Sequence, residues 1–298
     1  MRNLFYKILN KLYNPIYIRI HAVANGQIYA RENNDINKAL SRAAANIALR
    51  NIDETNPLSW EFSGFSQNGE DGILDFLWTK LKSQNRYFIE IGAANGIDNN
   101  TAWFAHAKKF SGLMIDGHND SIIRAKKHAT FGTECLNLFI NEENIIALKE
   151  KIVHTNPDIF SLDIDGNDYY VAKSILNNGI RPKIFIVEYN SVFGPNESVT
   201  IEYDPLFDID KAHATHLYYG VSITGWKTFF GNQGYQFVTV DSNGVNAVFV
   251  DKKEFDMSFL ENLKSVNFKE NFHQLNVFKC NWEKQLELIK EKKTITIS

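Results

Sequence analysis

The stretch Phe88 to Asn100 reads FIEIGAANGIDNN and decides the fold class. It begins as a short apolar run, carries Glu90 near the end of that run, and continues with Gly92 and Gly96 around small residues. In an open α/β sheet, ligands bind outside the carboxyl ends of the strands, and glycine lets the backbone approach them closely. The G-x-x-x-G spacing differs from the G-x-G-x-x-G of dinucleotide folds, and Glu90 would repel a pyrophosphate. Glu90 can instead accept a hydrogen bond from an ammonium group, and a helix beginning near Asn99 suits a carboxylate.

Strands and helices alternate on either side of this stretch. The expected strands are Tyr87–Ile91, Leu113–Asp116, Cys135–Ile140, Ile159–Asp163, Ile184–Glu188, Gln236–Val240 and Ala247–Val250. Helices are expected over residues 36–51, 69–82, 101–109, 120–128, 144–154, 168–177, 222–231 and 281–293. Continuous apolar strands between helices predict a mostly parallel sheet covered on both faces. The turn at residues 241–244 contains Asn-Gly, which predicts a hairpin between the last two strands. The sequence therefore predicts an α/β fold with a seven-stranded sheet that ends in an antiparallel hairpin.

Three regions follow from this pattern. Residues 1–60 form a helical N-terminal extension suited to oligomerisation or docking, residues 61–255 hold the sheet, and residues 256–298 form a partly helical C-terminal extension. Leu4, Phe5, Ile8, Leu9 and Leu12 repeat at helical spacing and predict an amphipathic helix over residues 3–13. Such a helix more often packs on its own domain or on a second copy in a homo-oligomer than on a membrane surface.

Composition narrows the function classes. The net charge is −3, from 35 acidic and 32 basic residues, which argues against a nucleic-acid partner. The two cysteines, Cys135 and Cys280, form neither a metal-binding spacing nor a disulfide framework, so a reducing, cytoplasmic setting is expected. The N-terminal residues are interrupted by Lys7, Asn10 and Lys11, which fits neither a secretory signal nor a membrane span.

Acidic residues follow four of the expected strands. Asp116 ends the second strand about 20 residues past the glycines, where an acid accepts hydrogen bonds from ribose hydroxyls. Asp163 and Asp165 close the fourth strand, and Glu188 with Asn190 closes the fifth. Neighbouring parallel strands lie about 4.8 Å apart, so these carboxylates should cluster, and clustered carboxylates repel one another unless a cation or a proton intervenes. Two interpretations stay open: a divalent cation such as Mg²⁺ or Mn²⁺, or one acid on the cofactor amine and another as general base.

Two histidines lie in the loop between the fifth strand and the last helix. His213 and His216 come close to Asp208 and Asp210 in the sequence. A histidine near the cofactor would suit general-base catalysis at neutral pH, which makes both candidate catalytic residues beside Asp163 and Asp165.

The ordered set of motifs resembles a class I S-adenosylmethionine-dependent methyltransferase of the FkbM type or a closely allied group. SQNGEDG at residues 66–72 resembles the S-Q-x-G-x-D segment before that sheet, FIEIGAANGIDNN resembles the cofactor loop, and SLDIDGND at residues 161–168 resembles L-K-I-D-V-E-G-x-E. Asp163 is also similar to a metal-ligating acid of catechol-type methyltransferases, with Glu188 and Asn190 as looser matches to its other two ligands. Ser161 replaces a lysine that is common in the FkbM type.

The resemblance implies a Rossmann-like sheet of the class I methyltransferases and a cofactor site. Glu90, Gly92, Asn95, Gly96, Asp116 and Asp163 would line it, Gln67 and Asp71 would cap its methionine end, and Asn141 would lie near the adenine. It implies O-methylation of a small polar acceptor, a sugar or nucleotide-sugar used for surface polysaccharide. The alternatives are a metal-dependent glycosyltransferase that uses Asp163 and Asp165 as a D-x-D motif, and a non-catalytic binding protein on the same fold.

Overall fold

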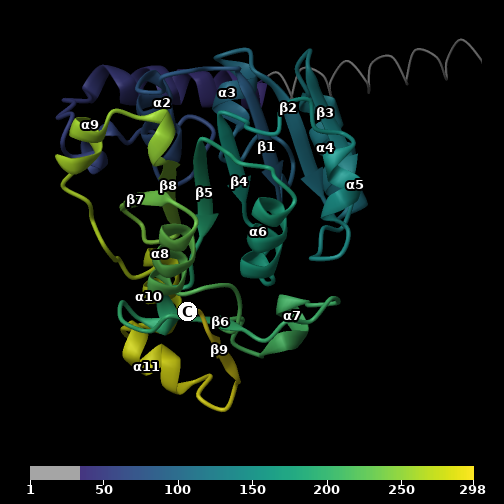
Figure 1. Ribbon diagram of the computed structural model, residues 1–298, viewed down its shortest axis with the longest axis vertical. Helices are drawn as coiled ribbons and strands as arrows, with labels where there is room; N and C mark the ends of the chain where they lie inside the picture. Colours follow the sequence, from purple (N-terminus) through teal and green to yellow (C-terminus); the bar gives the residue numbers. More distant parts are fainter. Residues whose placement is uncertain (1–33) are drawn as a thin grey trace, which may run out of the picture.

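A seven-stranded sheet forms the centre of the computed structural model, which describes residues 34–298 (Figure 1). Its strands are β1 (Tyr87–Ile91), β2 (Ser111–Asp116), β3 (Thr133–Asn137), β4 (Ile159–Leu162), β5 (Ile184–Glu188), β7 (Tyr235–Val240) and β8 (Asn246–Asp251). Their order is β3-β2-β1-β4-β5-β8-β7. The first five are parallel, and β8 runs antiparallel to both β5 and β7. This order and these directions give a Rossmann-like, mostly parallel sheet that ends in an antiparallel pair, and they confirm the predicted fold class.

Helices cover both faces of the sheet, as its continuous apolar strands require. On one face lie the helix at residues 34–49, α2 (Glu70–Thr79), α3 (Ala102–His106), α4 (Asn119–His128) and α9 (Met257–Glu261). On the other lie α5 (Ile145–Lys149), α6 (Asp168–Asn177) and α8 (Ile223–Asn232). The helix expected over residues 144–154 is shorter than predicted, because the chain tightens where the Lys151 amide donates to the Leu148 carbonyl.

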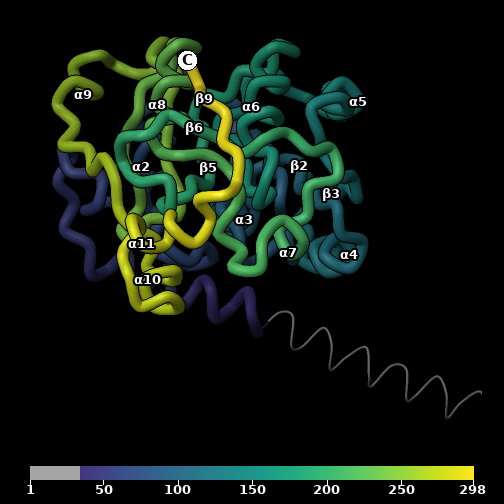
Figure 2. Tube along the Cα trace, turned by 90° about the horizontal axis from the view of Figure 1, so that it is seen from below, coloured from purple at the N-terminus to yellow at the C-terminus, as the bar shows by residue number. Residues whose placement is uncertain are grey.

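A second layer crosses the carboxyl ends of the strands (Figure 2). It contains η2 (Ser191–Phe193), β6 (Val199–Ile201), α7 (Ile209–Ala212), α10 (Phe272–Phe278), α11 (Trp282–Glu287) and β9 (Thr294–Thr296). Strands β6 and β9 pair antiparallel, and they are absent from the strands expected from the sequence because each has only three residues. This layer places the end of the chain beside the edge of the sheet where ligands bind in such folds.

The connections complete the architecture. Two short 3-10 helices lie in these connections: η1 (Pro57–Trp60) precedes α2, and η3 (Lys252–Glu254) follows β8. No helix within residues 34–298 is long and apolar enough to cross a membrane. The amphipathic helix expected over residues 3–13 lies outside the described residues.

Candidate functional site

A cavity of about 460 Å³ opens where the strand order reverses, at the carboxyl ends of β1, β2 and β4. The FIEIGAANGIDNN loop forms one wall, and residues 66–70 with residues 245–246 form the opposite wall. Leu138, Phe139 and Ile140 provide an apolar end, while Asp163, Asp165, Asn167 and Phe207 lie at the other end. The site therefore has an apolar end suited to a flat ring and a polar end rich in carboxylates.

Gly92 makes the closest approach in the loop. Its φ is +90°, and a Cβ there would lie 1.6 Å from the Asp163 carbonyl oxygen. Its amide and that of Ala93 donate to the Ile115 carbonyl, at 2.9 and 3.0 Å. Gly96 also has a positive φ, +76°, and a Cβ there would meet the Ala125 Cα at 3.0 Å. The two glycines let the loop lie tight against β4 and α4.

Glu90 turns inward rather than toward a ligand amine. Its Oε1 accepts the Asn100 amide at 2.9 Å, and its Oε2 accepts the amide and the hydroxyl of Thr101. The anion at the start of α3 is thus the protein's own carboxylate, although the sequence suggested that these amides would hold a ligand carboxylate. Burial raises the pKa of Glu90 to about 7 even with these hydrogen bonds. Glu90 lines the cavity, but its carboxylate mainly fixes the loop.

Asp116 and Asn141 lie toward the apolar end with different roles. Asp116 lines the cavity, and its two oxygens accept the amides of Ala94 (2.9 Å) and His118 (2.7 Å). Each oxygen keeps a lone pair for a ribose hydroxyl. Asn141 is not among the lining residues, and its Oδ1 accepts the amides of Glu143 and Asn144 before α5.

The SQNGEDG segment supplies a wall through residues other than those expected. Gln67 lines the cavity, whereas Asp71 is fully buried behind it and accepts the amides of Gly64, Phe65 and Ser66. Burial raises the pKa of Asp71 to about 7. Asn95, at the loop tip, caps its own turn by accepting the Ile97 and Asp98 amides.

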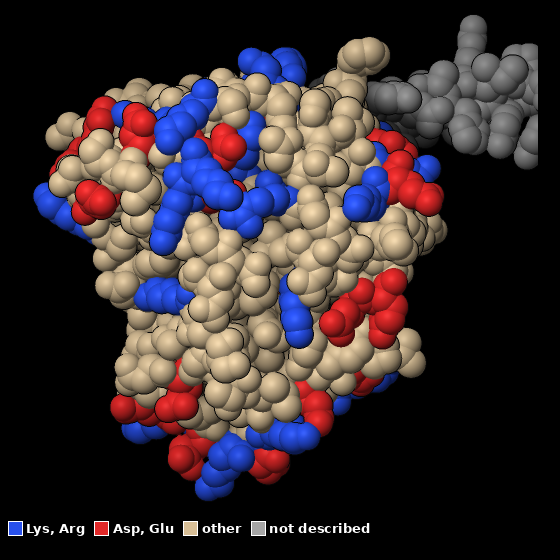
Figure 3. All heavy atoms as spheres, in the orientation of Figure 1, with Lys and Arg blue, Asp and Glu red and all other residues tan. Residues whose placement is uncertain are grey.

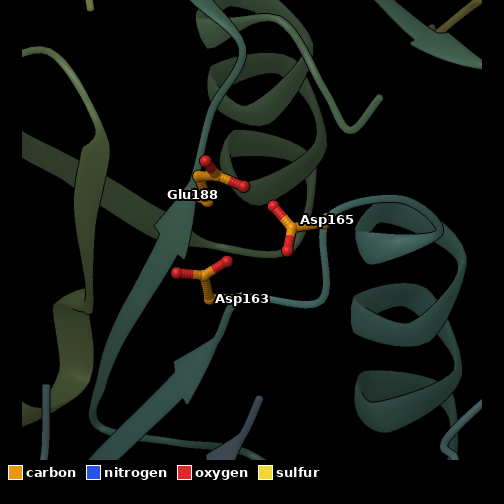
Figure 4. A group of neighbouring side chains, drawn as sticks. All are labelled: Asp163, Asp165 and Glu188. Atoms are coloured by element: carbon orange, nitrogen blue, oxygen red, sulfur yellow. The ribbon is translucent and has the colours of Figure 1, made fainter. Parts of the chain in front are cut away.

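Three carboxylates meet at the polar end, and we call Asp163, Asp165 and Glu188 the acidic triad (Figure 4). One oxygen from each lies within 4.8 Å of the others. Burial, with Asp165 close by, raises the pKa of Asp163 well above its usual range, and burial beside Asp163 does the same for Glu188. Oε1 of Glu188 accepts the Tyr219 hydroxyl at 3.2 Å, and its buried Oε2 has no hydrogen-bond partner. Because clustered carboxylates repel one another, a proton or a cation shared within the triad would offset its charge.

Asn190 lies outside the triad. Its amide nitrogen donates to the Leu217 and Tyr219 carbonyls, and its oxygen accepts the Val192 amide. The side chain therefore ties the end of β5 to the 217–219 segment, and Asp165 takes the place that the sequence assigned to Asn190 among the clustered groups.

His213 and His216 do not line the cavity. His213 contacts the Thr215 hydroxyl at 2.7 Å and Glu291 at 3.1 Å, while His216 lies 3.7 Å from Asp210. The same segment instead contributes Phe207, whose ring lies against Gly166 and reaches the cavity.

Several lining residues were not singled out from the sequence. Asn68, Glu70, Asn99 and Asn100 belong to motifs quoted above, and Asn246 begins β8. Their positions in those motifs were the available signal. Only the paired strands β5 and β8, with Glu188 opposite Asn246, show that Asn246 reaches the site.

No protein-family model matches the sequence, and no curated protein matches it significantly. Solved structures of similar fold include an O-methyltransferase from Bacillus cereus in complex with SAH, at 14% identity and a TM-score of 0.42, covering 73% of this chain and 90% of that one. Cofactor-bound Rv0187 from MTB shares 13% identity at a TM-score of 0.40, and the match covers 73% of this chain and 89% of that one. The METTL16 methyltransferase domain shares 13% sequence identity with this chain at a TM-score of 0.40. That match covers 61% of this chain and just under two thirds, 65%, of the METTL16 domain. These likenesses extend to the fold alone.

Proposed function

We propose that the chain is an S-adenosylmethionine-dependent O-methyltransferase of the FkbM type that acts on a small, polar, hydroxyl-bearing acceptor such as a sugar. One observation carries the proposal: a single cavity at the switch point joins an apolar end, Asp116, the Gly92 loop and two acids of the triad, Asp163 and Asp165, in that order along the sheet. Glu188 lies next to these two acids. The apolar end suits adenine, Asp116 suits the ribose, and the loop suits the methionine chain. The triad then lies where an acceptor would meet the methyl group.

Methyl transfer requires that the acceptor oxygen be positioned against the methyl carbon and that the acceptor hydroxyl lose its proton. The acceptor hydroxyl gives its proton to a carboxylate of the triad as its oxygen bonds to the methyl carbon. The carbon–sulfur bond breaks with its electron pair on sulfur, leaving S-adenosylhomocysteine. Asp163 is the residue we assign as base, because it directly follows β4 and its carbonyl touches Gly92. Burial raises the pKa of Asp163, and a carboxylate with a raised pKa is a stronger base than an ordinary one.

A divalent cation is the other occupant that the triad fits. Three carboxylates with an unpaired buried Oε2 on Glu188 form an oxygen donor set of the kind that Mg²⁺ or Mn²⁺ prefers. Such an ion would lower the pKa of a bound hydroxyl, while Asp163, Asp165 and Glu188 would hold it. Methyl transfer that EDTA abolishes and Mg²⁺ or Mn²⁺ restores would assign the triad to a metal.

The cofactor assignment is tested by ligand-induced stabilisation. S-adenosylhomocysteine should raise the melting temperature, and UDP or GDP with Mn²⁺ should not, because a ligand that binds only the folded state stabilises it. The reverse result would favour the D-x-D glycosyltransferase over the methyltransferase.

Asp163→Asn tests the base. It should keep the stabilisation by S-adenosylhomocysteine and lower methyl transfer to sugar acceptors by about 10²–10⁴-fold, the usual contribution of a general base. Asp256→Asn is the matched control, because Asp256 is exposed and its side chain makes no cap hydrogen bond to α9. If Asp163→Asn transferred methyl groups as fast as the native protein, Asp163 would not be the base. If the variant kept the protein's cellular role while methyl transfer was lost, a non-catalytic binding protein would be favoured.

A further inference from the structure

The walls of the cavity have a one-sided charge. Six carboxylates line it, from Glu70, Glu90, Asp98, Asp116, Asp163 and Asp165. Among residues 34–298 no lysine or arginine lines it, and His118 is its one imidazole. On the face shown in Figure 3, acidic side chains gather at lower right, at the level of α7. A cleft lined by one sign of charge concentrates ligands of the opposite sign and repels those of its own.

Hydrogen bonding points the same way, independently of net charge. The Asn246 side chain is 3% exposed and donates its amide nitrogen to Glu70 Oε1 at 2.7 Å, which leaves its Oδ1 buried without a partner. Glu188 is 9% exposed, and its Oε2 is also without a partner. The two residues pair directly across β5 and β8, so both side chains project from the same face of the sheet. Two buried acceptors at one place are suited to a ligand that donates hydrogen bonds.

Figure 4 shows how Glu188 lies relative to Asp163 and Asp165, the two triad acids that line the cavity. The Glu188 carboxylate points toward Asp165, and Asp163 directly follows β4. Tyr219 and Trp226 fix its position, because the Tyr219 hydroxyl donates to Oε1 and the Trp226 indole donates to the Glu188 carbonyl at 2.8 Å. Glu188 is thus a preorganised acceptor.

We propose that the acceptor bears a protonated amine, as an amino sugar does, and that Glu188 and Asp165 bind this ammonium group with Asn246 as a further acceptor. This inference rests on the proposed methyltransferase function and names its substrate class. An ammonium group has three N–H donors, which match the unpaired oxygens of the site. A nucleotide-sugar would bring a diphosphate to a cavity without a cationic side chain among its described lining residues. The acceptor is therefore a free amine-bearing polyol rather than its nucleotide-linked form.

Binding to the protein saturated with S-adenosylhomocysteine tests the proposal, because the amine of the cofactor is then already in place. The probes are glucosamine, galactosamine and mannosamine, each paired with its N-acetyl form, and UDP-N-acetylglucosamine, measured by titration calorimetry. At least one free amine should bind ten-fold or more tightly than its neutral N-acetyl form, and UDP-N-acetylglucosamine should bind more weakly still. High salt should weaken the amine preference, since the attraction is electrostatic.

Glu188→Gln supplies the structural arm, because it keeps the shape of the side chain and removes its charge. It should lower the affinity for the amine about ten-fold and leave the affinity for S-adenosylhomocysteine and for the N-acetyl form unchanged, whereas Asp256→Asn should change none of them. Equal binding of amine and N-acetyl forms, no binding of any amine, tighter binding of the UDP-sugar, or an unaltered preference in Glu188→Gln would each overturn the proposal. Failure of S-adenosylhomocysteine itself to bind would instead overturn the proposed function.

Discussion

Gly92 occupies a position where two constraints coincide in one residue. Its φ of +90° disfavours any side chain, and a Cβ would lie 1.6 Å from the carbonyl oxygen of Asp163, which directly follows β4. We predict that Gly92→Ala lowers the free energy of unfolding by more than about 2 kcal/mol and abolishes S-adenosylhomocysteine binding, since clash adds to the ordinary cost of a positive φ, about 1–3 kcal/mol. Gly179→Ala is the control, because its φ is +77° but no atom lies within 4 Å of the added Cβ. Chemical denaturation and titration calorimetry measure both effects, and equal losses in the two variants would contradict the steric argument.

At the scale of elements, the three-residue strand β9 joins the last residues of the chain to the main core. Ile297 follows β9, is 3% exposed, and packs in the cluster on the α8 face of the sheet. We predict that Ile297→Ala lowers the free energy of unfolding by about 2–4 kcal/mol, as buried isoleucine-to-alanine changes do. Ile123→Ala on α4, where the side chain is 47% exposed, should change it by less than about 0.5 kcal/mol. Urea denaturation decides, and a small effect at Ile297 would mean that the end of the chain is not held as the structure shows.

At the scale of the whole molecule, buried acids couple stability to pH. Burial raises the pKa of Asp71 and of Glu90 to about 7 and that of Asp168 to about 6. Each raised value means that the folded state holds a proton which the unfolded state has released, so stability falls as pH rises from about 4 to about 7. His106, whose pKa burial lowers to about 4, acts in the opposite direction below pH 6.5. Because these contributions overlap, the contribution of one acid to the pH dependence of stability is measured by comparing the native protein with a variant that lacks this acid.

Asp71→Asn is that variant, because the three backbone amides all donate to Oδ2 and the oxygen of an asparagine can still accept them. Between pH 5 and 7, the stability of the native protein relative to Asp71→Asn should fall by up to about 1.4 kcal/mol per pH unit, the limit for one proton. Asp256→Asn should give no such trend. Denaturant titrations at several pH values measure it, and a difference independent of pH would show that Asp71 is ionised throughout.

Much of the fold could be predicted from the sequence, because each buried strand is marked by a continuous apolar run in its own residues. The expected strands Tyr87–Ile91 and Ile184–Glu188 match β1 and β5 at both ends, and the Asn-Gly turn joins β7 to β8 as predicted. The short strands β6 and β9 could not be predicted, because their pairing joins segments about 95 residues apart and the three residues of each strand carry no periodic signal.

The candidate site, like the fold, could be predicted only in part from the sequence. By itself, the sequence determined which acids end the strands and that the loop at Gly92 must lie close to a neighbour, because both follow from strand position and glycine spacing. Only the tertiary structure decided which polar groups remain free for a ligand. Glu90, Asp71 and Asn190 are occupied by backbone groups of the protein, whereas Glu188 and Asn246 keep unpaired oxygens. The physical reason is that a buried polar group binds whichever donor or acceptor the fold places beside it, and that neighbour often comes from a distant part of the chain.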